Sequence, residues 1–468
     1  MKKRLKKIAA IACSVLMLFG MTACGSESAY EIAVKNGFVG TEEEWLRSLH
    51  GADGEDGKDV TAKDLYETAC KNGYEGTYIE FCTNVLKVNV VENNDVDTIA
   101  KNMTSVVSVY CGFSRTTKTG GFGWGSNTTK TEYYCTAGSG VIVDLNKENG
   151  NALIVTNYHV IHDAASDSGV SDSIWLYLYG AYNGFGATES GSYSETTGDG
   201  MRATFVGGSA AHDIALLRVS GSEYLQKSIA SEATFANSDE AQAGEKVFAV
   251  GNPEGEGISV TEGIVSVESE YIVMTLSDDS KETVDYRVLR TDAAINSGNS
   301  GGALFNAQGA LIGITNAKNA NSDVDNMGYA LPSTQVKRLC QNILRNEALY
   351  GDGAVRVARL GISVKITSSE AYYDKNGKLK IREEFSVMEV SARSAAAANG
   401  ISVGDRITAI KVGEEGWFSF TRQYQLIESL LPVAINDVIE LKYISYSDGN
   451  EKTATIKFDK ESYFTTFS

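Results

Sequence analysis

The sequence is poor in histidine, the commonest metal ligand in proteins. It has only four histidines in 468 residues: His50, His159, His162 and His212. No Cys/His spacing matches a zinc site, and no glycine-rich segment matches a phosphate-binding loop. Beyond residue 21, no apolar run reaches the 18 residues that a transmembrane helix needs. We therefore expect no metal, no cofactor and no further membrane-spanning segment.

Positive charge is also scarce. The chain has 42 Lys and Arg residues against 60 Asp and Glu residues, for a net charge of −18 at pH 7. The first 23 residues carry five basic and no acidic residues, so removing them leaves 37 against 60, or −23. Such a chain lacks the basic surface that binds nucleic acid or anionic lipid headgroups. The length predicts two or three domains, and 47 glycines with 43% hydrophobic residues fit a strand-rich globular protein.

Residues 1–23 are predicted to be an export signal, because basic residues precede an apolar run over residues 8–21. The run ends in Met21-Thr22-Ala23-Cys24-Gly25, which resembles a bacterial lipobox. In lipoproteins of that type the cysteine is diacylated and becomes the first residue, and two acyl chains anchor stably where one does not. We predict lipidation of Cys24 and a chain anchored to the outer face of the bacterial cell membrane. An uncleaved anchor and an ordinary export signal with a chance cysteine are the alternatives.

Residues 24–90 contain an internal repeat at an offset of 36 residues, from Tyr30 to Tyr66. In each copy an Asn-Gly pair is expected to end a first short helix, and a Thr-x-x-Glu capping box to begin a second. These signals are Asn36-Gly37, Thr41 and Glu44 in the first copy, and Asn72-Gly73, Thr77 and Glu80 in the second. The copies are predicted to be helical hairpins, too short to carry the main function. Residues 51–59 have glycine at every third position but no proline, and are interpreted as a flexible acidic linker.

From Val106 onward, short β-branched and apolar runs alternate with glycines, a pattern typical of an antiparallel barrel. Residues 333–349 have apolar side chains on one helical face and are expected to form a helix that closes this domain at about residue 350. The sequence therefore predicts a mainly β domain over residues 93–350.

Three motifs in this domain supply the parts of a catalytic triad. They are Thr156-Asn157-Tyr158-His159, His212-Asp213-Ile214 and Gly298-Asn299-Ser300-Gly301-Gly302. A serine hydroxyl needs a base within hydrogen-bond reach and a carboxylate that orients the base. We predict Ser300 as nucleophile, His159 as base and Asp213 as the orienting carboxylate. His162 and His212 lie outside the base motif and are interpreted as structural, and the rival serines Ser139 and Ser297 lack the flanking Gly-x-Ser-Gly-Gly pattern.

Together these segments resemble the chymotrypsin-like fold and, more specifically, the HtrA/DegP family of trypsin-like proteases. The resemblance runs from about residue 95 to about residue 460. Four further co-linear blocks carry it: residues 138–142, 249–253 with 260–266, 291–296 and 328–333. It implies a double β-barrel, a serine endopeptidase that cleaves unfolded or misfolded exported proteins, and a trimeric protease core. Ser297 and Ala303 stand where the family usually has proline, so a weakly hydrolytic chaperone on the same fold is the alternative.

The resemblance also assigns residues around the nucleophile. The N–H groups of Gly298 and Ser300 are expected to form the oxyanion hole. Ala294 lies six positions before the nucleophile, where the chymotrypsin family has the floor of the substrate pocket. An uncharged floor favours small aliphatic residues before the cut and argues against Lys or Arg.

Residues 355–462 resemble an α+β PDZ domain of the HtrA kind. Leu360-Gly361-Ile362 matches the carboxylate-binding loop, and Gly404-Asp405-Arg406-Ile407 matches the core turn. Such a domain adds a peptide as an extra strand and captures its C-terminus, so peptide C-termini are expected partners. The insert 413–417 and the long segment 366–385 depart from the family pattern.

The cysteines suggest disulfides in an exported protein. Cys70 and Cys82 replace Val34 and Leu46 of the first repeat, and a bridge between them is predicted, with two buried thiols as the alternative. Cys111 and Cys135 flank the first predicted barrel hairpin, where a bridge and two thiols are equally open. Cys340 is interpreted as a core thiol.

Overall fold

The computed structural model describes most of the chain from residue 95 onward and parts of the first repeat region. The described residues are 29–35, 37–41, 44–45, 62–74, 76, 81, 85–86 and 95–467, the last without 121–126, 189–190, 195–196, 276–282 and 317–326. The predicted signal, Cys24, Cys82 and the linker 51–59 lie outside this set. The chain divides into two units, residues 1–93 and 94–468. Among the residues described, no helix is long and apolar enough to cross a membrane.

In the N-terminal unit, both repeat copies begin with a helix, α2 (Ala29–Lys35) and α4 (Ala62–Lys71). Gly37 and Gly73 follow with φ of +97° and +95°, so each helix ends at a left-handed glycine as predicted. In the first copy the backbone N–H of Thr41 donates to Glu44 Oε2 at 2.7 Å, and Glu44 N–H donates to Thr41 Oγ1 at 3.2 Å. This confirms the first capping box. Thr77 and Glu80 of the second lie outside the described residues.

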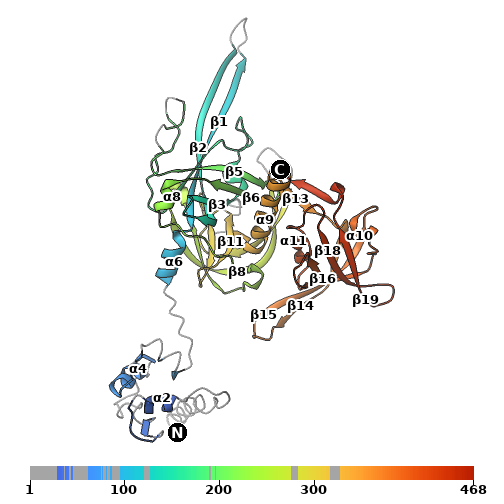
Figure 1. Ribbon diagram of the computed structural model, residues 1–468. Coiled ribbons are helices and arrows are strands. Elements are labelled where there is room, and N and C mark those ends of the chain that lie inside the picture. The colour runs from blue at the N-terminus through green and yellow to red at the C-terminus, as the bar shows by residue number, and fades with distance from the viewer. Residues whose placement is uncertain are drawn as a thin grey trace, which may run out of the picture. The chain divides into compact units, whose positions relative to one another are not determined.

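Residues 106–332 form two closed antiparallel barrels of six strands each (Figure 1). The strand order is β1-β2-β3-β6-β5-β4 in the first barrel and β10-β11-β12-β9-β8-β7 in the second. The first barrel comprises β1 (Val106–Gly120), β2 (Asn127–Asn146), β3 (Asn151–Thr156), β4 (Ser173–Leu178), β5 (Met201–Ser209) and β6 (Ile214–Val219). The second comprises β7 (Lys246–Gly251), β8 (Ser259–Thr275), β9 (Thr283–Thr291), β10 (Ala303–Asn306), β11 (Leu311–Asn316) and β12 (Gly328–Pro332). The mainly β, double-barrel prediction is confirmed.

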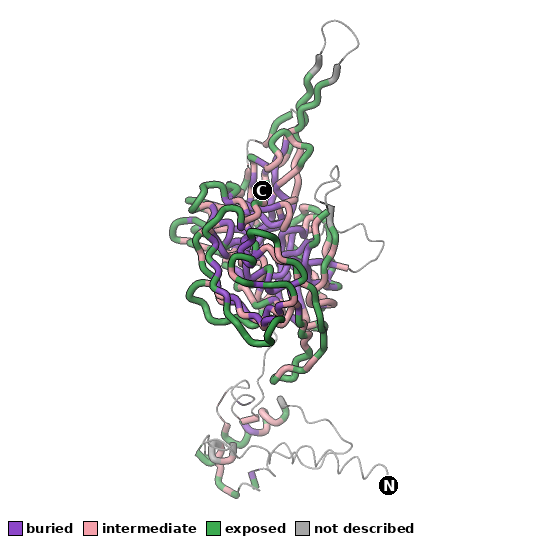
Figure 2. The backbone as a smooth tube through the Cα atoms, turned by 90° about the vertical axis from the view of Figure 1, so that its right-hand side faces the viewer, coloured by how far each residue is buried: buried purple, intermediate pink, exposed green. Residues whose placement is uncertain are grey.

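The apolar runs seen in the sequence form the barrel interiors. All six residues of β11, for example, are buried. A shared core of both barrels includes Val106 and Val155 from the first and Phe305 and Ile314 from the second. The barrels therefore meet across a packed seam, and the loops that cross it can hold residues from both sides in one site. The outer part of the β1–β2 hairpin extends beyond this core and is exposed (Figure 2).

Short helices connect and cover these strands: α6 (Asp95–Met103), α7 (Tyr158–Ile161), α8 (Glu223–Lys227), η2 (Ser238–Glu240) and η3 (Pro253–Gly255). The predicted closing helix is α9 (Ser333–Tyr350), which buries Val336, Leu339 and Ile343 in the shared core. It ends at Gly351, whose φ of +80° stops the helix.

Residues 355–467, here called the C-terminal region, form a second sheet around a core of their own. Its strand order is β14-β15-β16-β18-β19, with β17 paired to β16, so β14 is an edge strand. The strands are β14 (Ile362–Tyr373), β15 (Leu379–Val390), β16 (Arg406–Val412), β17 (Phe418–Ser419), β18 (Val438–Ile444) and β19 (Glu451–Lys457). The helices are α10 (Ala395–Ala398), α11 (Tyr424–Ser429) and η4 (Glu461–Tyr463). Beyond residue 462, where we expected this region to end, β20 (Phe464–Phe467) pairs with β13 (Val355–Ala358).

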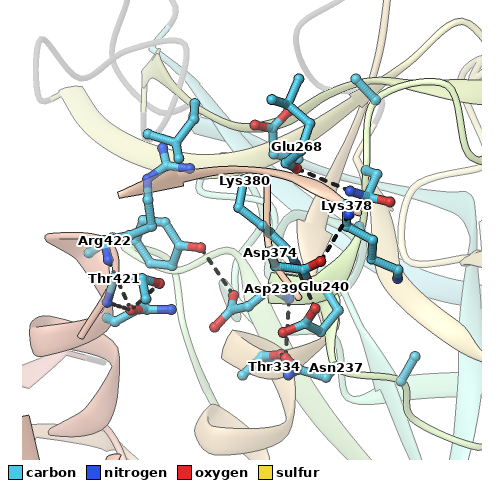
Figure 3. A pocket seen from close by; sticks show the side chains of 18 of the residues that line it. Asn237, Asp239, Glu240, Glu268, Thr334, Asp374, Lys378, Lys380, Thr421 and Arg422 are labelled. Carbon is cyan, nitrogen blue, oxygen red and sulfur yellow. Dashed lines mark hydrogen bonds and ion pairs between the residues drawn. The ribbon is translucent and has the colours of Figure 1, made fainter. Parts of the chain in front are cut away.

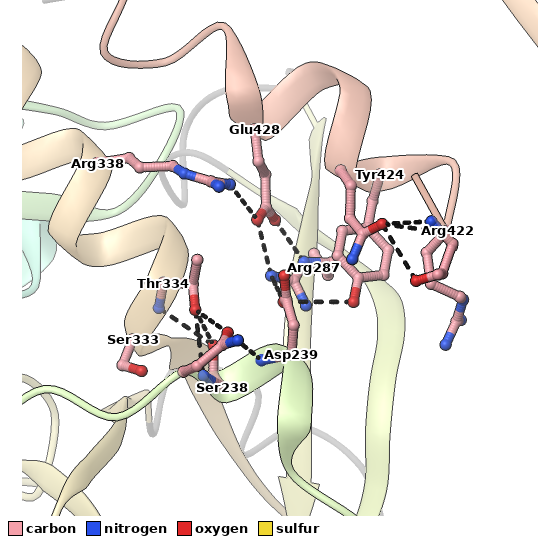
Figure 4. Close-up of polar contacts among 12 residues, drawn as sticks. Ser238, Asp239, Arg287, Ser333, Thr334, Arg338, Arg422, Tyr424 and Glu428 are labelled. Carbon is pink, nitrogen blue, oxygen red and sulfur yellow. Dashed lines mark hydrogen bonds and ion pairs between the residues drawn. The ribbon is translucent and has the colours of Figure 1, made fainter. Parts of the chain in front are cut away.

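The C-terminal region is joined to the second barrel by a buried ionic cluster (Figure 4). The Arg287 guanidinium, from β9, donates to both carboxylate oxygens of Glu428, from α11, at 2.5 and 2.9 Å. It also lies over the Tyr424 ring and within 3.5 Å of Asp239. Both Arg287 and Glu428 are at most 4% exposed. A buried charge is costly unless it is paired. Arg287 and Glu428 therefore each depend on the other element being packed in place.

Beside this cluster lies a cavity of about 960 Å³ between η2, α9 and the outer part of the β14–β15 hairpin (Figure 3). Lys380 Nζ pairs with Glu240 Oε2 at 2.5 Å, and Gln242 Nε2 donates to the Leu379 carbonyl at 3.1 Å. The unusual segment 366–385 is therefore the outer part of this hairpin, and its end contacts the second barrel.

The Cys111–Cys135 bridge is not formed, and both residues are free thiols. The strand register explains this, because Cys111 lies opposite Thr136 and Cys135 lies opposite Gly112. This offset of one residue places the two side chains on opposite faces of the hairpin. Burial raises the pKa of both thiols. Cys70 is exposed and is also a free thiol, and Cys82, its predicted partner, lies outside the described residues. Cys340 is buried as expected.

Candidate active site

His159 and Asp213 lie in direct contact in the first barrel. His159 is on α7, immediately after β3, and Asp213 is in the turn between β5 and β6. The Asp213 carboxylate lies 2.8 and 3.0 Å from His159 Nδ1, and its Oδ1 also accepts the backbone N–H of His159 at 3.0 Å. Because a carboxylate only accepts, Nδ1 carries the proton, and proton transfer to a substrate falls to Nε2.

The backbone conformation of Asp213 is unusual, and two neighbouring side chains hold it in place. Its φ is +48°, in the left-handed region that costs a non-glycine residue roughly 1–3 kcal/mol. Asn157 Nδ2 donates to the Asp213 carbonyl at 2.9 Å, and Asn316 Nδ2 donates to Asp213 Oδ2 at 2.8 Å. All three residues are buried. Sequence reasoning missed both asparagines: Asn157 lay unnoticed inside the histidine motif, and Asn316, at the end of β11, carries no local signal.

Ser300 lies in the loop between β9 and β10 and is buried. Its carbonyl accepts the Ser139 N–H at 2.8 Å. The next residue, Gly301, has a φ of +82°, and a Cβ there would collide with the Ser139 carbonyl and Thr156 Oγ1. The Ser300 loop of the second barrel is therefore pressed against the segment just before His159 in the first barrel.

Two peptide groups of this loop are oriented by their carbonyls. The Ser297 carbonyl accepts the Glu254 N–H at 2.8 Å, and the Asn299 carbonyl accepts Thr315 Oγ1 at 2.6 Å. Because C=O and N–H point in opposite directions across a trans peptide, the N–H groups of Gly298 and Ser300 point away from these anchors.

The rival serine Ser139 has a supporting position in the same loop. Its hydroxyl donates to the Gly298 carbonyl at 2.7 Å and accepts the Asn252 N–H at 2.8 Å. Ser139 is fully buried. Its oxygen is therefore engaged in holding the loop rather than exposed as a nucleophile.

Comparison with known proteins agrees with this geometry. A family model described as a trypsin-like peptidase domain matches residues 138–314. The Do-like serine protease HtrA of Lactococcus lactis subsp. cremoris (strain MG1363) is 33% identical over 396 residues, which cover 81% of this chain and 86% of the relative. The chain belongs to the HtrA family of serine proteases. It is a serine endopeptidase.

Two other relatives are similar over less of the chain. The Do-like serine protease HtrA of Bacillus subtilis (strain 168) is 30% identical, covering 73% of this chain and 67% of the relative. The periplasmic serine endoprotease DegP of Escherichia coli (strain K12) is 32% identical, covering 61% and 50%. A solved HtrA-type protease, AlgW with a decapeptide, aligns at 21% identity and a TM-score of 0.44, covering 80% of this chain and 98% of that one.

In this HtrA-family protease the predicted pocket residue Ala294 is exposed, and its carbonyl accepts Thr261 Oγ1 at 2.9 Å. Asp292 is two residues earlier, but its Oδ1 accepts the Ile264 N–H at 2.7 Å. That carboxylate is tied to the β8 backbone. Within the described ranges, no three His, Cys, Asp or Glu side chains gather closely enough to hold a metal ion.

The predicted peptide loop of this protease lies at the start of the edge strand β14. Leu360 is buried, Gly361 has a φ of +72°, and Ile362 begins the strand. The Leu360 carbonyl accepts the Ala396 N–H at 2.9 Å, and the Gly361 carbonyl accepts the Ser391 N–H at 2.8 Å. The N–H groups of Gly361 and Ile362 therefore point away from these partners.

A side chain links the edge strand β14 to the residues just before α11. Gln423, immediately before α11, donates through Nε2 to the Val364 carbonyl of β14 at 3.3 Å. A peptide strand added to this edge would need the outward carbonyls of β14, and Gln423 already donates to one of them, that of Val364. Sequence reasoning missed Gln423, which lies beside the predicted peptide loop.

Proposed function

We propose that this HtrA-family protease cleaves unfolded or misfolded exported proteins with a triad of Ser300, His159 and Asp213. The observation that carries the proposal is the double contact of Asp213 with the ring and backbone of His159. Ser300 attacks the scissile carbonyl while His159 Nε2 takes its proton. The same proton then goes to the leaving amine, and water repeats the sequence to release the acyl group. Asp213 holds the tautomer and stabilises the imidazolium.

In this mechanism the N–H groups of Gly298 and Ser300 stabilise the oxyanion of the tetrahedral intermediate. The carbonyl anchors at Glu254 and Thr315 support this role, because they fix both peptide groups before substrate binds. Each preorganised donor is worth roughly 2.7–4 kcal/mol in the transition state.

Casein digestion by the full chain tests the triad. Ser300→Ala and His159→Ala should abolish hydrolysis, and Asp213→Asn should lower turnover about 10⁴-fold because the wrong histidine tautomer is held. Asp172→Asn, an exposed residue of the first barrel, is the matched control and should keep wild-type activity. Wild-type digestion by Ser300→Ala would refute the assignment.

The cleavage preference follows from Ala294. An uncharged pocket floor, with Asp292 tied to β8, supports cuts after Val, Ala or Ile. Mass-spectrometric mapping of casein products should show these residues before the cut. A dominant cut after Lys or Arg would contradict the pocket assignment.

The C-terminal region is proposed to be a PDZ-like domain that binds peptides with free apolar C-termini. The outward N–H groups of Gly361 and Ile362 support capture of the carboxylate, as charge-assisted hydrogen bonds. In the full chain carrying Ser300→Ala, calorimetry should show that amidating the peptide weakens binding and that Gly361→Pro does the same. Equal binding of acid and amide peptides would exclude this mode.

We also propose that the protein is extracytoplasmic and anchored by a lipidated Cys24. The lipobox-like segment supports this, as does similarity to a protease named periplasmic. The mature chain should fractionate with membranes and carry acyl mass at Cys24, and Cys24→Ala should release it. An unmodified N-terminus beyond residue 24 would contradict the anchor. The trimeric core stays a prediction.

A further inference from the structure

The turn that carries Asp213 is packed by elements far away in the sequence. It joins β5 to β6 and includes His212 immediately before Asp213. From the second barrel, the Tyr286 hydroxyl donates to the Ala210 carbonyl at 2.8 Å. Within the turn, His212 Nδ1 lies 3.0 Å from Ser209 Oγ. On its other side the His212 ring meets the ring of Phe467 edge to face, with centroids 5.1 Å apart and planes at 88°.

Phe467 reaches this turn because of the last described strand, β20. Its register with β13 places Phe467 opposite Val355, which is fully buried in the core shared by both barrels. Phe467 packs against that same core. Figure 1 shows the C-terminus beside α9 and β13, on the catalytic domain rather than at the far sheet of the C-terminal region. The two ends of the C-terminal region thus form one two-stranded ribbon that packs against the protease barrels.

We propose that Phe467 and His212 are positioning residues that hold the turn before Asp213 and so keep its carboxylate aligned on His159. The proposal rests on the triad proposed above. Asp213 has a left-handed backbone conformation, which persists only where the surroundings over-determine it. Asn157 and Asn316 hold Asp213 itself, whereas Phe467 holds the residue before it, so loss of the Phe467 ring lets the turn relax.

The state of His212 is compatible with this packing role. Burial, aided by the nearby Arg359 guanidinium, lowers the pKa of His212 to about 4. The ring is therefore neutral at pH 7 and packs against Phe467 as an uncharged side chain. Arg359 lies 5.8 Å from the centroid of the Phe467 ring.

Strand β20 itself offers a matched control. Phe464 is at its other end and packs against Phe458 in the core of the C-terminal region, with centroids 5.9 Å apart. Removing either phenylalanine ring weakens β20, but only Phe467 contacts His212. A loss of activity that is confined to Phe467 therefore separates positioning from general destabilisation.

The experiment measures kcat, KM and Tm of the full-length chain with a fluorogenic peptide. Phe467→Ala should lower kcat about tenfold with KM changed less than about twofold, because a displaced catalytic group costs turnover rather than binding. Phe467→Tyr, which keeps the ring, should restore kcat to within about twofold. Phe464→Ala should lower Tm as much as Phe467→Ala and keep kcat. In a His212→Ala background, Phe467→Ala should have no further effect on kcat, because the contact between the two rings is already lost.

Three results would overturn the inference. Wild-type kcat in Phe467→Ala beside an inactive Asp213→Asn would refute the inference alone. Equal losses of kcat and Tm in Phe464→Ala and Phe467→Ala would show a purely structural role. Wild-type activity of Asp213→Asn would remove the proposed triad, and this inference with it.

Discussion

The two barrels hold their proposed catalytic residues in different ways. In the second barrel the Ser300 loop is shaped by backbone contacts, with Gly298 and Gly301 at positive φ where a Cβ would collide. In the first barrel Asp213 is itself at positive φ and is held by side chains from three separate elements, namely Asn157, Asn316 and, through His212, Phe467. A loop shaped by backbone contacts needs glycines at closely spaced positions, so it can be recognised in the sequence as a motif. A residue held by distant side chains leaves no local pattern.

The largest effect is expected from a substitution that disrupts the Ser300 loop. Gly301→Ala should abolish proteolysis, because the added methyl group collides with the Ser139 carbonyl and the residue is strained at a φ of +82°. Gly221→Ala is the control: its φ is +64°, but no atom lies within 4 Å of the added Cβ. It should cost roughly 1 kcal/mol of stability and no activity. Casein hydrolysis and urea unfolding measure both, and an active Gly301→Ala would show that this loop tolerates rearrangement.

The next effect tests whether the second barrel depends on the C-terminal region. Arg287→Met removes the two hydrogen bonds to buried Glu428 and leaves that carboxylate only the longer ion pair with Arg338, at 3.6 Å, which should lower the free energy of unfolding by about 3–5 kcal/mol. Arg345→Met removes the more exposed pair with Asp437 and should cost less than about 1 kcal/mol. Urea titration of both variants makes the comparison. Equal losses would mean that the buried cluster contributes no more than a surface ion pair.

A smaller effect sharpens the account of side-chain support in the first barrel. Asn316→Ala removes one hydrogen bond to the Asp213 carboxylate, and hydrogen bonds to charged groups contribute about 1.5–3 kcal/mol. We expect kcat to fall by roughly 10- to 150-fold with KM nearly unchanged. Steady-state kinetics with a peptide substrate measure kcat and KM separately. A change in KM alone would assign Asn316 to substrate binding instead.

The smallest effect concerns the pH dependence of the same turn. The pKa of His212 is lowered from 6.5 to about 4, so between these values the unfolded chain binds more protons than the folded protein. Its contribution to stability is therefore present above pH 6.5 and is lost as the pH falls, by about 1 kcal/mol at pH 5.5. His212→Gln should be free of this loss. Urea titrations at pH 7 and 5.5 should show the wild type weakening relative to the variant, and a constant difference would refute the assignment.

The pair Cys111 and Cys135 shows what sequence reasoning had to leave open and why. Their positions at the first hairpin were recognised, but a disulfide also requires that both side chains lie on one face. The register of β1 with β2, which is set by the closure of the whole barrel, is offset by one residue from that arrangement. No local feature of the sequence encodes that offset. The same holds for segment 366–385, whose contact with Glu240 depends on how two domains meet.

By itself the sequence determined the mainly β class, the closing helix, the first capping box and the motif residues His159, Asp213 and Ser300. These follow from short-range rules: alternating apolar runs, glycines at positive φ and polar residues at fixed spacing. Only the tertiary structure decided which residues support Asp213, to which carbonyl the Ser139 hydroxyl donates and where Phe467 packs. Those partners are up to 255 residues apart, as from His212 to Phe467, and they meet only because barrel closure and the β13–β20 ribbon bring their strands together.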